Sequence, residues 1–453
     1  MNTTDTTATT NTTAGDQGGK AASSPVSSFD PSFDYDIAII GAGPVGLALA
    51  GWLAQRSSTQ ALRVALIDTG RPQAENASAD PRVIAVSQGS RLLIGALGWP
   101  HDATPIKRIH VSQRGHFGRM LIDHADYGLP ALGYVARYGS IVQALAGAVS
   151  HTHVRWLHGM RAFAPMTDDD GVTLSIGNAD DANDVQTNDV QTIRTRIVVN
   201  AEGGFYERAS SGDVHHRTAS SSQKHARTTR DYDQTALIGI VTVSAPQPHV
   251  AWERFTPQGP LALLPMDDAN AQGTQTIPHA PHSQYALVWC CAPDEAARRT
   301  QLPDAELLAE LNVAFGARMG RFTHIAHRAA FPLGLSAANA LVSGHGRIAA
   351  IGNAAQMLHP VSGQGMNLGL RDARTLADAF AQHGATPLAL ADFARRRAFD
   401  RRVTIRATDT LARMFTIDLA PLAILRGLAL TALEFAPPLK TSLARHMMFG
   451  QRT

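Results

Sequence analysis

The glycine-rich segment Gly41-Ala-Gly43-Pro-Val-Gly46 constrains the fold of this chain more than any other feature of the sequence. It follows the apolar run Tyr35–Ile40 and leads into Pro44–Gln55, so the pattern predicts a strand, a tight turn and a helix. Glycines at this spacing permit a sharp turn, close approach of the backbone to a pyrophosphate, and close packing of the helix on the strand. The N-terminus of the helix offers its N–H groups to the same anion.

The strand predicted next, Arg63–Asp68, ends in an acidic residue roughly 20 residues after the last of these glycines. An acid at this place binds the ribose hydroxyls of an adenosine in dinucleotide-binding βαβ units. We therefore predict that Gly41, Gly43, Gly46 and Asp68 bind a dinucleotide; the alternative is a glycine-rich turn that binds nothing. No second glycine motif of this kind follows a predicted strand, so the sequence indicates one dinucleotide held in this way.

The stretch Ile37–Gln55 carries no charged side chain, and its length approaches the about 20 residues that span a bilayer. A membrane span leaves its four glycines unexplained, whereas the strand, turn and helix account for them. We therefore interpret the stretch as part of a soluble domain. The low charged fraction of the whole chain, 17%, still indicates some apolar surface.

Composition excludes several classes of function. The formal net charge of +2 is too balanced for a dedicated nucleic-acid binder. The two cysteines are adjacent, Cys290 and Cys291, which excludes a disulfide scaffold and a four-thiolate zinc site and favours a reducing, cytoplasmic setting. His215 and His216 lie in a polar tract and are interpreted as solvated surface residues, so no metal site is expected.

The order of apolar and polar segments predicts an α/β protein with an inserted antiparallel sheet. Residues 1–33 are rich in Thr, Ser, Gly and Asp and are predicted to be a disordered tail. The chain of 453 residues is long enough for two or three domains. Polar loop insertions are predicted at the tandem NDVQT repeat of residues 183–192, at Ser210–Asp233 and at Asp267–Gln284. Strands are predicted at Ala236–Val243, Ala251–Phe255, Leu261–Pro265 and Tyr285–Cys291, and helices from about Pro387 onward.

A second glycine motif lies within the segment Arg347–Asp372. The pattern predicts a strand that ends at Asn353, whose side chain can bond a polyol hydroxyl, followed by a tight Gly363-Gln-Gly365 turn and a helix to about Phe380. N–H groups at such a helix start can stabilise negative charge on a flat ring, as a reduced flavin carries. The alternative is a glycine turn before an amphipathic helix.

This segment resembles the flavin-binding segment of the class A FAD-dependent aromatic hydroxylases. The segments Asp80–Ser87, His110–His116, Leu132–Val135 and Glu253–Met266 are similar to motifs of the ubiquinone-biosynthesis branch of that class. The resemblance covers roughly residues 35–450 without the polar insertions. Two positions depart from the class: Asn353 stands where an Asp is usual, and Asn200-Ala-Glu202-Gly203 stands where an Asp-Gly motif is usual.

The resemblance implies bound FAD, NAD(P)H as electron donor, and a C4a-hydroperoxyflavin that hydroxylates a polyprenylated methoxyphenol para to its hydroxyl group. It implies flavin contacts at Asn353, Pro360, Gly363, Gln364, Gly365, Met366 and Asn367. It also implies second-rank FAD contacts at Arg82 and Gln143, for each of which the alternative is a surface residue. His359 is the one catalytic candidate, with a packed, hydrogen-bonded histidine as the alternative. Trp252, Phe255 and Trp289 either pack in the core or line an aromatic pocket.

The same resemblance divides the chain into domains: a Rossmann-like FAD domain at residues 34–110, 131–205 and 340–385, a mostly β substrate domain at 111–130 and 234–339, and a C-terminal helical segment at 386–453. Within that last segment Leu419–Leu433 carries one charge, Arg426, and is too short to span a bilayer. It either packs on the protein or docks at the inner face of the membrane, where a polyprenyl substrate resides.

Two other functions are left open by the sequence. One is a class A hydroxylase of a small soluble aromatic acid, which requires a cationic residue in the pocket. The other is a non-catalytic flavoprotein that scaffolds a ubiquinone-biosynthesis complex, which the departures at Glu202 and Asn353 suggest.

Overall fold

The computed structural model describes residues 30–70, 80, 82–115, 118–179, 190–203, 227–267, 282–359, 363–416 and 434–450. Several sequence predictions lie outside these ranges: most of the N-terminal tail, most of the three polar insertions, His215 and His216, Pro360, and the apolar stretch Leu419–Leu433.

The first sheet is built on three parallel strands, β1 (Tyr35–Ile40), β2 (Val64–Asp68) and β11 (Gln191–Asn200). Its order is β17-β18-β11-β1-β2-β8, with β17 (Val342–Ser343), β18 (Ile348–Ala350) and β8 (Arg155–His158). The central strands are almost wholly buried, as parallel strands covered on both faces are. The uncharged stretch that begins at Ile37 is therefore a strand and a helix of this domain, as predicted.

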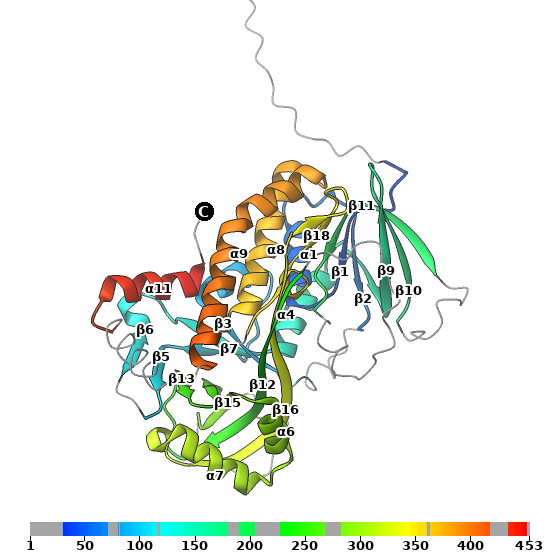
Figure 1. The fold of residues 1–453 in the computed structure, drawn as a ribbon. Coiled ribbons are helices and arrows are strands. Elements are labelled where there is room, and N and C mark those ends of the chain that lie inside the picture. The colour runs from blue at the N-terminus through cyan, green and yellow to red at the C-terminus, as the bar shows by residue number, and fades with distance from the viewer. Residues whose placement is uncertain are drawn as a thin grey trace, which may run out of the picture.

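Helices cover one face of this sheet and two antiparallel strands cover the other. The helical face carries α1 (Pro44–Gln55), α4 (Tyr138–Ser150), α8 (Gln364–His383) and α9 (Pro387–Thr416), whose apolar side chains form one core with β1 and β2 (Figure 1). The opposite face packs against β10 (Val172–Asn178), which pairs with β9 (Met160–Thr167) and β11.

The second sheet has eight strands in the order β19-β16-β12-β15-β14-β13-β5-β6. Their bounds are β19 Gln356–Met357, β16 Phe322–Ala338, β12 Arg227–Val243, β15 Gln284–Cys291, β14 Gly259–Pro265, β13 Val250–Thr256, β5 Arg108–Gln113 and β6 Arg119–Asp123. All neighbours are antiparallel except β13 and β5. One face, which we call the outer face, packs on α7 (Asp304–Phe315) through a core that includes Trp252, Trp289 and Phe315; α6 (Pro293–Gln301) precedes α7.

The prediction of a loop over Ser210–Asp233 is wrong for its last residues, because β12 already begins at Arg227. This end of β12 is mostly exposed and lacks apolar alternation. It is a strand because it pairs with β16, from Arg227 opposite Ala338 to Asp231 opposite Gly334. The pairing partner lies about a hundred residues away in the sequence, so the local pattern does not reveal it.

A third, three-stranded sheet lies between the two large ones. It consists of β3 (Val83–Ser87), β7 (Gly133–Arg137) and β4 (Thr104–Ile106), in the order β3-β7-β4. Side chains of all three strands pack with residues of β12, β13 and β15 on the second face of the large antiparallel sheet, which we call the inner face. The helix α3 (Gln88–Ile94) follows β3, and short 3-10 turns occupy His124–Tyr127, Ala317–Met319 and Gly352–Ala354.

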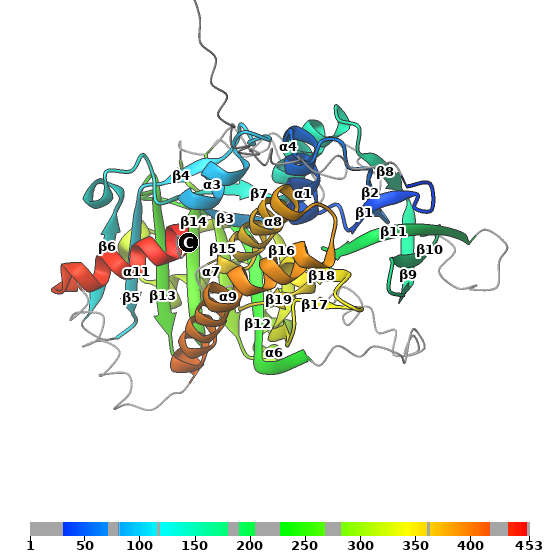
Figure 2. The same ribbon diagram turned by 90° about the horizontal axis from the view of Figure 1, so that it is seen from above.

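Two C-terminal helices lie along this assembly. Seen from above, α9 and α11 (Pro437–Phe449) cross the strands of the second sheet (Figure 2). Among the described residues no helix is both long and apolar enough to cross a membrane. The predicted fold class, an α/β cofactor domain with an antiparallel-sheet domain and C-terminal helices, is confirmed; the domain boundaries stay a prediction.

Candidate active site

The first glycine motif forms a turn that only glycine fits. Gly41 has φ +101°, and a Cβ there would lie 3.0 Å from the backbone of Ala201 at the end of β11. A Cβ on Gly46 would lie 2.0 Å from the carbonyl oxygen of Gly41. The turn is therefore pressed against both the neighbouring strand and its own helix. The helix that follows has Gly43 as its N-cap with no side-chain cap, so its first-turn N–H groups can bind an anion.

Asp68, the last residue of β2, lies beside this turn. Its carboxylate accepts the backbone N–H of Ala42 at 2.6 Å and that of Gly70 at 2.7 Å. The carboxylate therefore fixes the glycine turn. Each of its oxygens still has lone-pair capacity for a ligand hydroxyl.

Arg82 lies near the glycine turn because it packs on Tyr138. The guanidinium lies 4.0 Å from the centre of the Tyr138 ring and forms an ion pair with Asp80. A Cβ on Gly43 would lie 3.2 Å from the Tyr138 hydroxyl, so this ring borders the turn. Sequence reasoning missed Tyr138, because nothing in its local pattern marks a contact with the first glycine motif. Gln143, one helical turn further along α4, is exposed.

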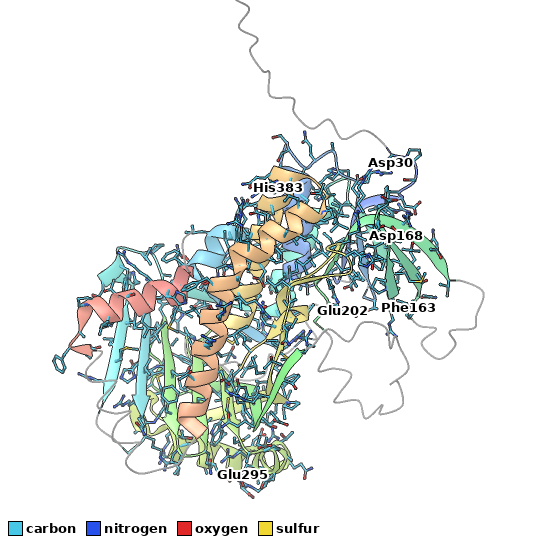
Figure 3. All side chains as sticks on the ribbon, turned by 45° about the horizontal axis from the view of Figure 1, so that its top comes forward. Asp30, Phe163, Asp168, Glu202, Glu295 and His383 are labelled. Carbon is cyan, nitrogen blue, oxygen red and sulfur yellow. The ribbon has the colours of Figure 1, made fainter. Side chains whose placement is uncertain are left out.

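The second glycine motif meets the first at the carboxyl end of the parallel strands. Asn353 lies in the 3-10 turn after β18, three residues beyond the end of that strand, because the chain turns at Gly352 with φ +59°. A Cβ on Gly203 would lie 3.5 Å from the side-chain amide nitrogen of Asn353. The Glu202 backbone also borders Gly41. Figure 3 shows Glu202 between the α/β half of the molecule, which carries Asp168, and the antiparallel sheet below it.

The start of α8 is fixed to the third sheet by Asn367. Its side-chain oxygen accepts the N–H of Ser87 at 2.9 Å, and its amide nitrogen donates to the carbonyl groups of Ala85 and Gly363. Gly363 is the N-cap of α8, has φ +59° and carries no side chain that could cap the helix. The first-turn N–H groups of Gly365 and Met366 are therefore placed to bind a ligand, and a Cβ on Gly365 would meet open space.

His359 precedes this helix and lies between the two halves of the molecule. It is 1% exposed, and its Nε2 lies 3.1 Å from the side-chain oxygen of Gln234 on β12. Burial lowers the pKa of His359 to about 4, so the ring is neutral at pH 7. This environment is that of a packed, hydrogen-bonded histidine; its catalytic role stays a prediction.

The inner face of the second sheet has a band of partly exposed residues at one register level. Each of six adjacent strands contributes one residue, and backbone pairing joins them across the sheet; they are Val111, Glu253, Ala262, Val288, Ile238 and Ala329. We call these six residues the central row. Trp252 and Trp289 point to the outer face, where they are core residues under α7, whereas Phe255 is buried on the inner face.

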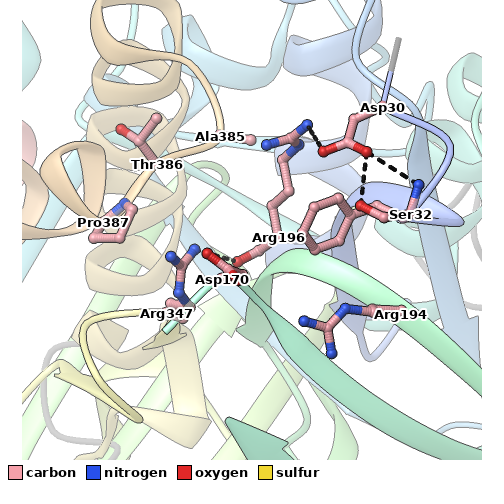
Figure 4. A pocket seen from close by; sticks show the side chains of 10 residues that line it. Asp30, Ser32, Asp170, Arg194, Arg196, Arg347, Ala385, Thr386 and Pro387 are labelled. Atoms are coloured by element: carbon pink, nitrogen blue, oxygen red, sulfur yellow. Dashed lines mark hydrogen bonds and ion pairs between the residues drawn. The ribbon is translucent and has the colours of Figure 1, made fainter. Parts of the chain in front are cut away.

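A separate cavity of about 530 Å³ lies at the other end of the α/β half (Figure 4). It is lined by Asp30, Arg194, Arg196 and Arg347 among others, near the start of β1. Its charges are already compensated, since Arg196 pairs with Asp30 and Arg194 with Asp168. The convergent glycine turns lie at the carboxyl ends of the strands instead, where ligands of open α/β sheets bind.

These observations fit FAD. Two helices, α1 and α8, present uncapped N-termini preceded by glycines whose Cβ would clash with the backbone or with Ala85. One such terminus suits a pyrophosphate and the other suits the electron-rich edge of a flavin ring. Asp68 and Asn353 supply polar side chains for hydroxyl groups beside these termini.

Comparison with known proteins agrees with this geometry. The sequence pattern of the family described as "FAD binding domain" matches residues 34–398. The chain is 32% identical to ubiquinone hydroxylase UbiL of Rhodospirillum rubrum, over 95% of this chain and 94% of that protein. It is 29% identical to 3-demethoxyubiquinol 3-hydroxylase of Escherichia coli, over 91% of this chain and 98% of that protein. Among solved structures, p-nitrophenol 4-monooxygenase PnpA of Pseudomonas putida has a TM-score of 0.67 at 14% identity, covering 92% of this chain and 99% of that one.

The fold and the paired glycine turns define an FAD-dependent aromatic monooxygenase that uses NAD(P)H and O2. The chain belongs to the FAD-binding-domain family, in the branch of class A hydroxylases that contains the ubiquinone hydroxylases.

Proposed function

We propose that this monooxygenase adds a hydroxyl group to a polyprenylated methoxyphenol, para to the phenol hydroxyl, during ubiquinone biosynthesis. The pathway is supported by relatives from bacteria and animals whose names place them in ubiquinone biosynthesis and which align over nine tenths of this chain. The class of substrate is supported by the central row, which is the observation on which the proposal chiefly depends.

The central row suits an apolar aromatic substrate. Five of its six members are Val, Ile or Ala, and none of the six is cationic. A small aromatic acid buried against this row would leave its carboxylate without a counter-charge, which is costly. A methoxyphenol with a prenyl chain gains free energy from burial against the same side chains, by about 25 cal/mol per Å² of apolar surface.

The described residues are placed to hold the cofactor. Bound FAD, reduced by NAD(P)H, supplies the activated oxygen that side chains cannot provide. Asp68, Arg82 and the α1 N-terminus would bind its adenosine and pyrophosphate, and Asn353 its ribityl chain. The N–H groups at the start of α8 would bind the pyrimidine edge of the flavin and favour negative charge there. Gln143 and Asn367 remain proposed contacts, the latter through its backbone.

The polyprenyl chain of the proposed substrate resides in a membrane, and an exposed apolar surface lies next to the site. Phe435, Leu439 and Leu443, at and just before α11, are 81%, 65% and 40% exposed and follow one another at intervals of four residues; we call these three residues the α11 patch. The buried side of α11 packs with Val111, the end of the central row. We propose that the patch docks a cytoplasmic protein at the inner face of the membrane and that the prenyl chain enters beside α11.

The proposal is tested with purified protein. We expect bound yellow FAD, and oxidation of NAD(P)H that accelerates when a short-chain 2-prenyl-6-methoxyphenol is added, with a product one oxygen atom heavier by mass spectrometry. A strain that lacks the protein should accumulate the corresponding polyprenyl methoxyphenol.

Three results would contradict different parts of the proposal. Absence of flavin after reconstitution with FAD would contradict the cofactor site. Turnover of 3-demethoxyubiquinol in place of the methoxyphenol would move the reaction to another ring position. Flavin without a hydroxylated product, in the presence of lipid and of the other pathway proteins, would favour the scaffold function.

A further inference from the structure

Glu253 is the one ionisable residue of the central row. It lies on β13 opposite Val111 of β5 and Ala262 of β14, and its side chain lies on the same face as those of Ala251 and Phe255. Within the described part of the chain its carboxyl group has neither a hydrogen bond nor an ion pair. A half-buried carboxyl group with apolar neighbours and no partner is costly to fold, which calls for a functional reason.

The position of Glu253 relative to the flavin segment is set by contacts on both sides of the central row. On one side, Ala251 packs in a cluster with Ala85, and a Cβ on Gly363 would lie 3.2 Å from the Cβ of Ala85. On the other side, Gln234 contacts His359, which lies four residues before Gly363. Along the strand direction, the inner face thus contacts the flavin-binding segment on both sides of the central row. A ring bound between that segment and the sheet rests on the row itself.

We propose that Glu253 is the catalytic base that accepts the proton of the substrate's phenol hydroxyl. The inference rests on the proposed function, since it requires a phenol on the central row. The O–H bond breaks, the proton bonds to a carboxylate oxygen of Glu253, and the electron pair stays on the phenolate oxygen. That charge raises the electron density of the para carbon, which attacks the electrophilic oxygen that the flavin reaction supplies.

Each proton in this reaction has a donor and an acceptor. The ring carbon that has gained oxygen releases its hydrogen as a proton, and the ring becomes aromatic again. The carboxylic acid of Glu253 returns its proton to the first phenol oxygen. The side chain is therefore regenerated as a carboxylate. The ring loses two electrons as its carbon bonds to one oxygen atom of O2 and the O–O bond breaks, and the two electrons of NAD(P)H reduce the other oxygen atom to water.

The electrostatic surroundings suit this role. Burial raises the pKa of Glu253 to about 7, so the group can exchange a proton at physiological pH. Among the described residues of the same face, burial also raises the pKa of the Cys290 thiol, and the His359 ring is neutral. Arg230, near the start of β12, is already paired with Asp409 of α9. The cationic Arg254 of the same strand points to the outer face, where it lies over Phe315.

The test compares Glu253→Gln and Glu253→Asp with Glu306→Gln, an exposed glutamate on α7 that serves as a matched control. With all variants loaded with FAD, we expect Glu253→Gln to lower the rate of hydroxylated product by about 10²- to 10⁴-fold at pH 7. NAD(P)H oxidation then yields hydrogen peroxide instead of product. Glu253→Asp should recover part of the rate, and Glu306→Gln should match the wild type.

The pH dependence separates a base from a packing residue. The wild-type kcat for product formation should increase with pH, with an inflection near pH 7. Glu253→Gln should lack that inflection, and its kcat should increase only toward pH 10, where phenols ionise unaided. Without substrate, the Tm of Glu253→Gln should exceed that of the wild type increasingly from pH 4.5 to pH 8, because only the wild type must bury a carboxylate there.

Each outcome is decisive. A Glu253→Gln variant with the wild-type product rate and pH profile overturns the role of Glu253. If the wild type rejects the prenylated methoxyphenol but hydroxylates another phenol, the proposed function fails, and the same comparison on that phenol still decides the role of Glu253. A wild type that hydroxylates no phenol overturns both.

Discussion

The side chain of Asn367 accepts the backbone N–H of Ser87 at 2.9 Å, although 280 residues separate them in the sequence. The same amide group donates to Ala85 and Gly363. One buried side chain thus joins the first turn of α8 to strand β3. These three hydrogen bonds hold the N–H groups at the start of α8 in position.

Replacing Asn367 with Ala should therefore weaken the fold and the flavin site together. The N–H of Ser87 and the carbonyl groups lose their partner in a buried place, which costs about 1–3 kcal/mol. We expect a lower urea midpoint and a higher Kd for FAD, measured by flavin fluorescence. Asn339→Ala, which removes an exposed Asn bonded to Thr228, should change neither value by comparison. An unchanged Kd for FAD in Asn367→Ala would show that the helix start is fixed by other contacts.

Gly46→Ala should abolish the first glycine turn. The added methyl group would lie 2.0 Å from the Gly41 carbonyl oxygen, so the helix must move away from the strand. We expect mostly apoprotein after purification and a stability loss of about 1–3 kcal/mol. Gly147→Ala is the matched control, because Gly147 is exposed on α4 with open space at its Cβ, and Ala stabilises a helix there by up to about 1 kcal/mol. Full FAD content in Gly46→Ala would contradict the importance of this packing.

The sequence predicts those helices and strands that are determined by neighbouring residues, and it does not predict those that depend on contacts with distant parts of the chain. Helix α1 and strand β1 were predicted to the residue, and β2 to within one residue, because the glycine motif and its flanking apolar runs determine them locally. The opposite case is the start of β12 at Arg227, which is a strand only through its pairing with β16.

The site divides in the same way. The glycine turn could be predicted, and Asp68 could be named as a candidate contact beside it, because both lie within one βαβ unit. Tyr138 and Glu253 could not, since the first acquires its place from a contact with Gly43 and the second from the registers of neighbouring strands. The alternation of β13 also does not say which face is covered by α7, and so left the role of Trp252 open.

Acid should destabilise the protein partly through His359. Its pKa is about 4 in the folded protein and 6.5 as the ordinary value, so the unfolded state binds more protons as the pH falls from 6.5 to 4. The wild type should lose stability over that range, by at most about 3 kcal/mol from this residue. His359→Gln should show a shallower fall of Tm with decreasing pH, whereas His151→Gln, an exposed control, should follow the wild type. Parallel Tm curves for His359→Gln and wild type would contradict the assigned cause.

The α11 patch predicts binding to lipid. The double variant Leu439→Ser with Leu443→Ser removes two exposed apolar side chains, each of which gains about 1.5–3 kcal/mol when fully buried. In sedimentation with vesicles of phosphatidylethanolamine and phosphatidylglycerol, we expect the wild type to bind and the double variant to bind at least about 10²-fold more weakly. Val313→Ser is the control, because Val313 is 67% exposed on α7, far from α11 in Figure 1.

Turnover of a short-chain substrate in detergent should be unchanged in the double variant, because the patch lies on the side of α11 that faces away from the central row. Equal vesicle binding by all three proteins would assign membrane contact to another surface, and absence of wild-type binding would exclude docking through this patch.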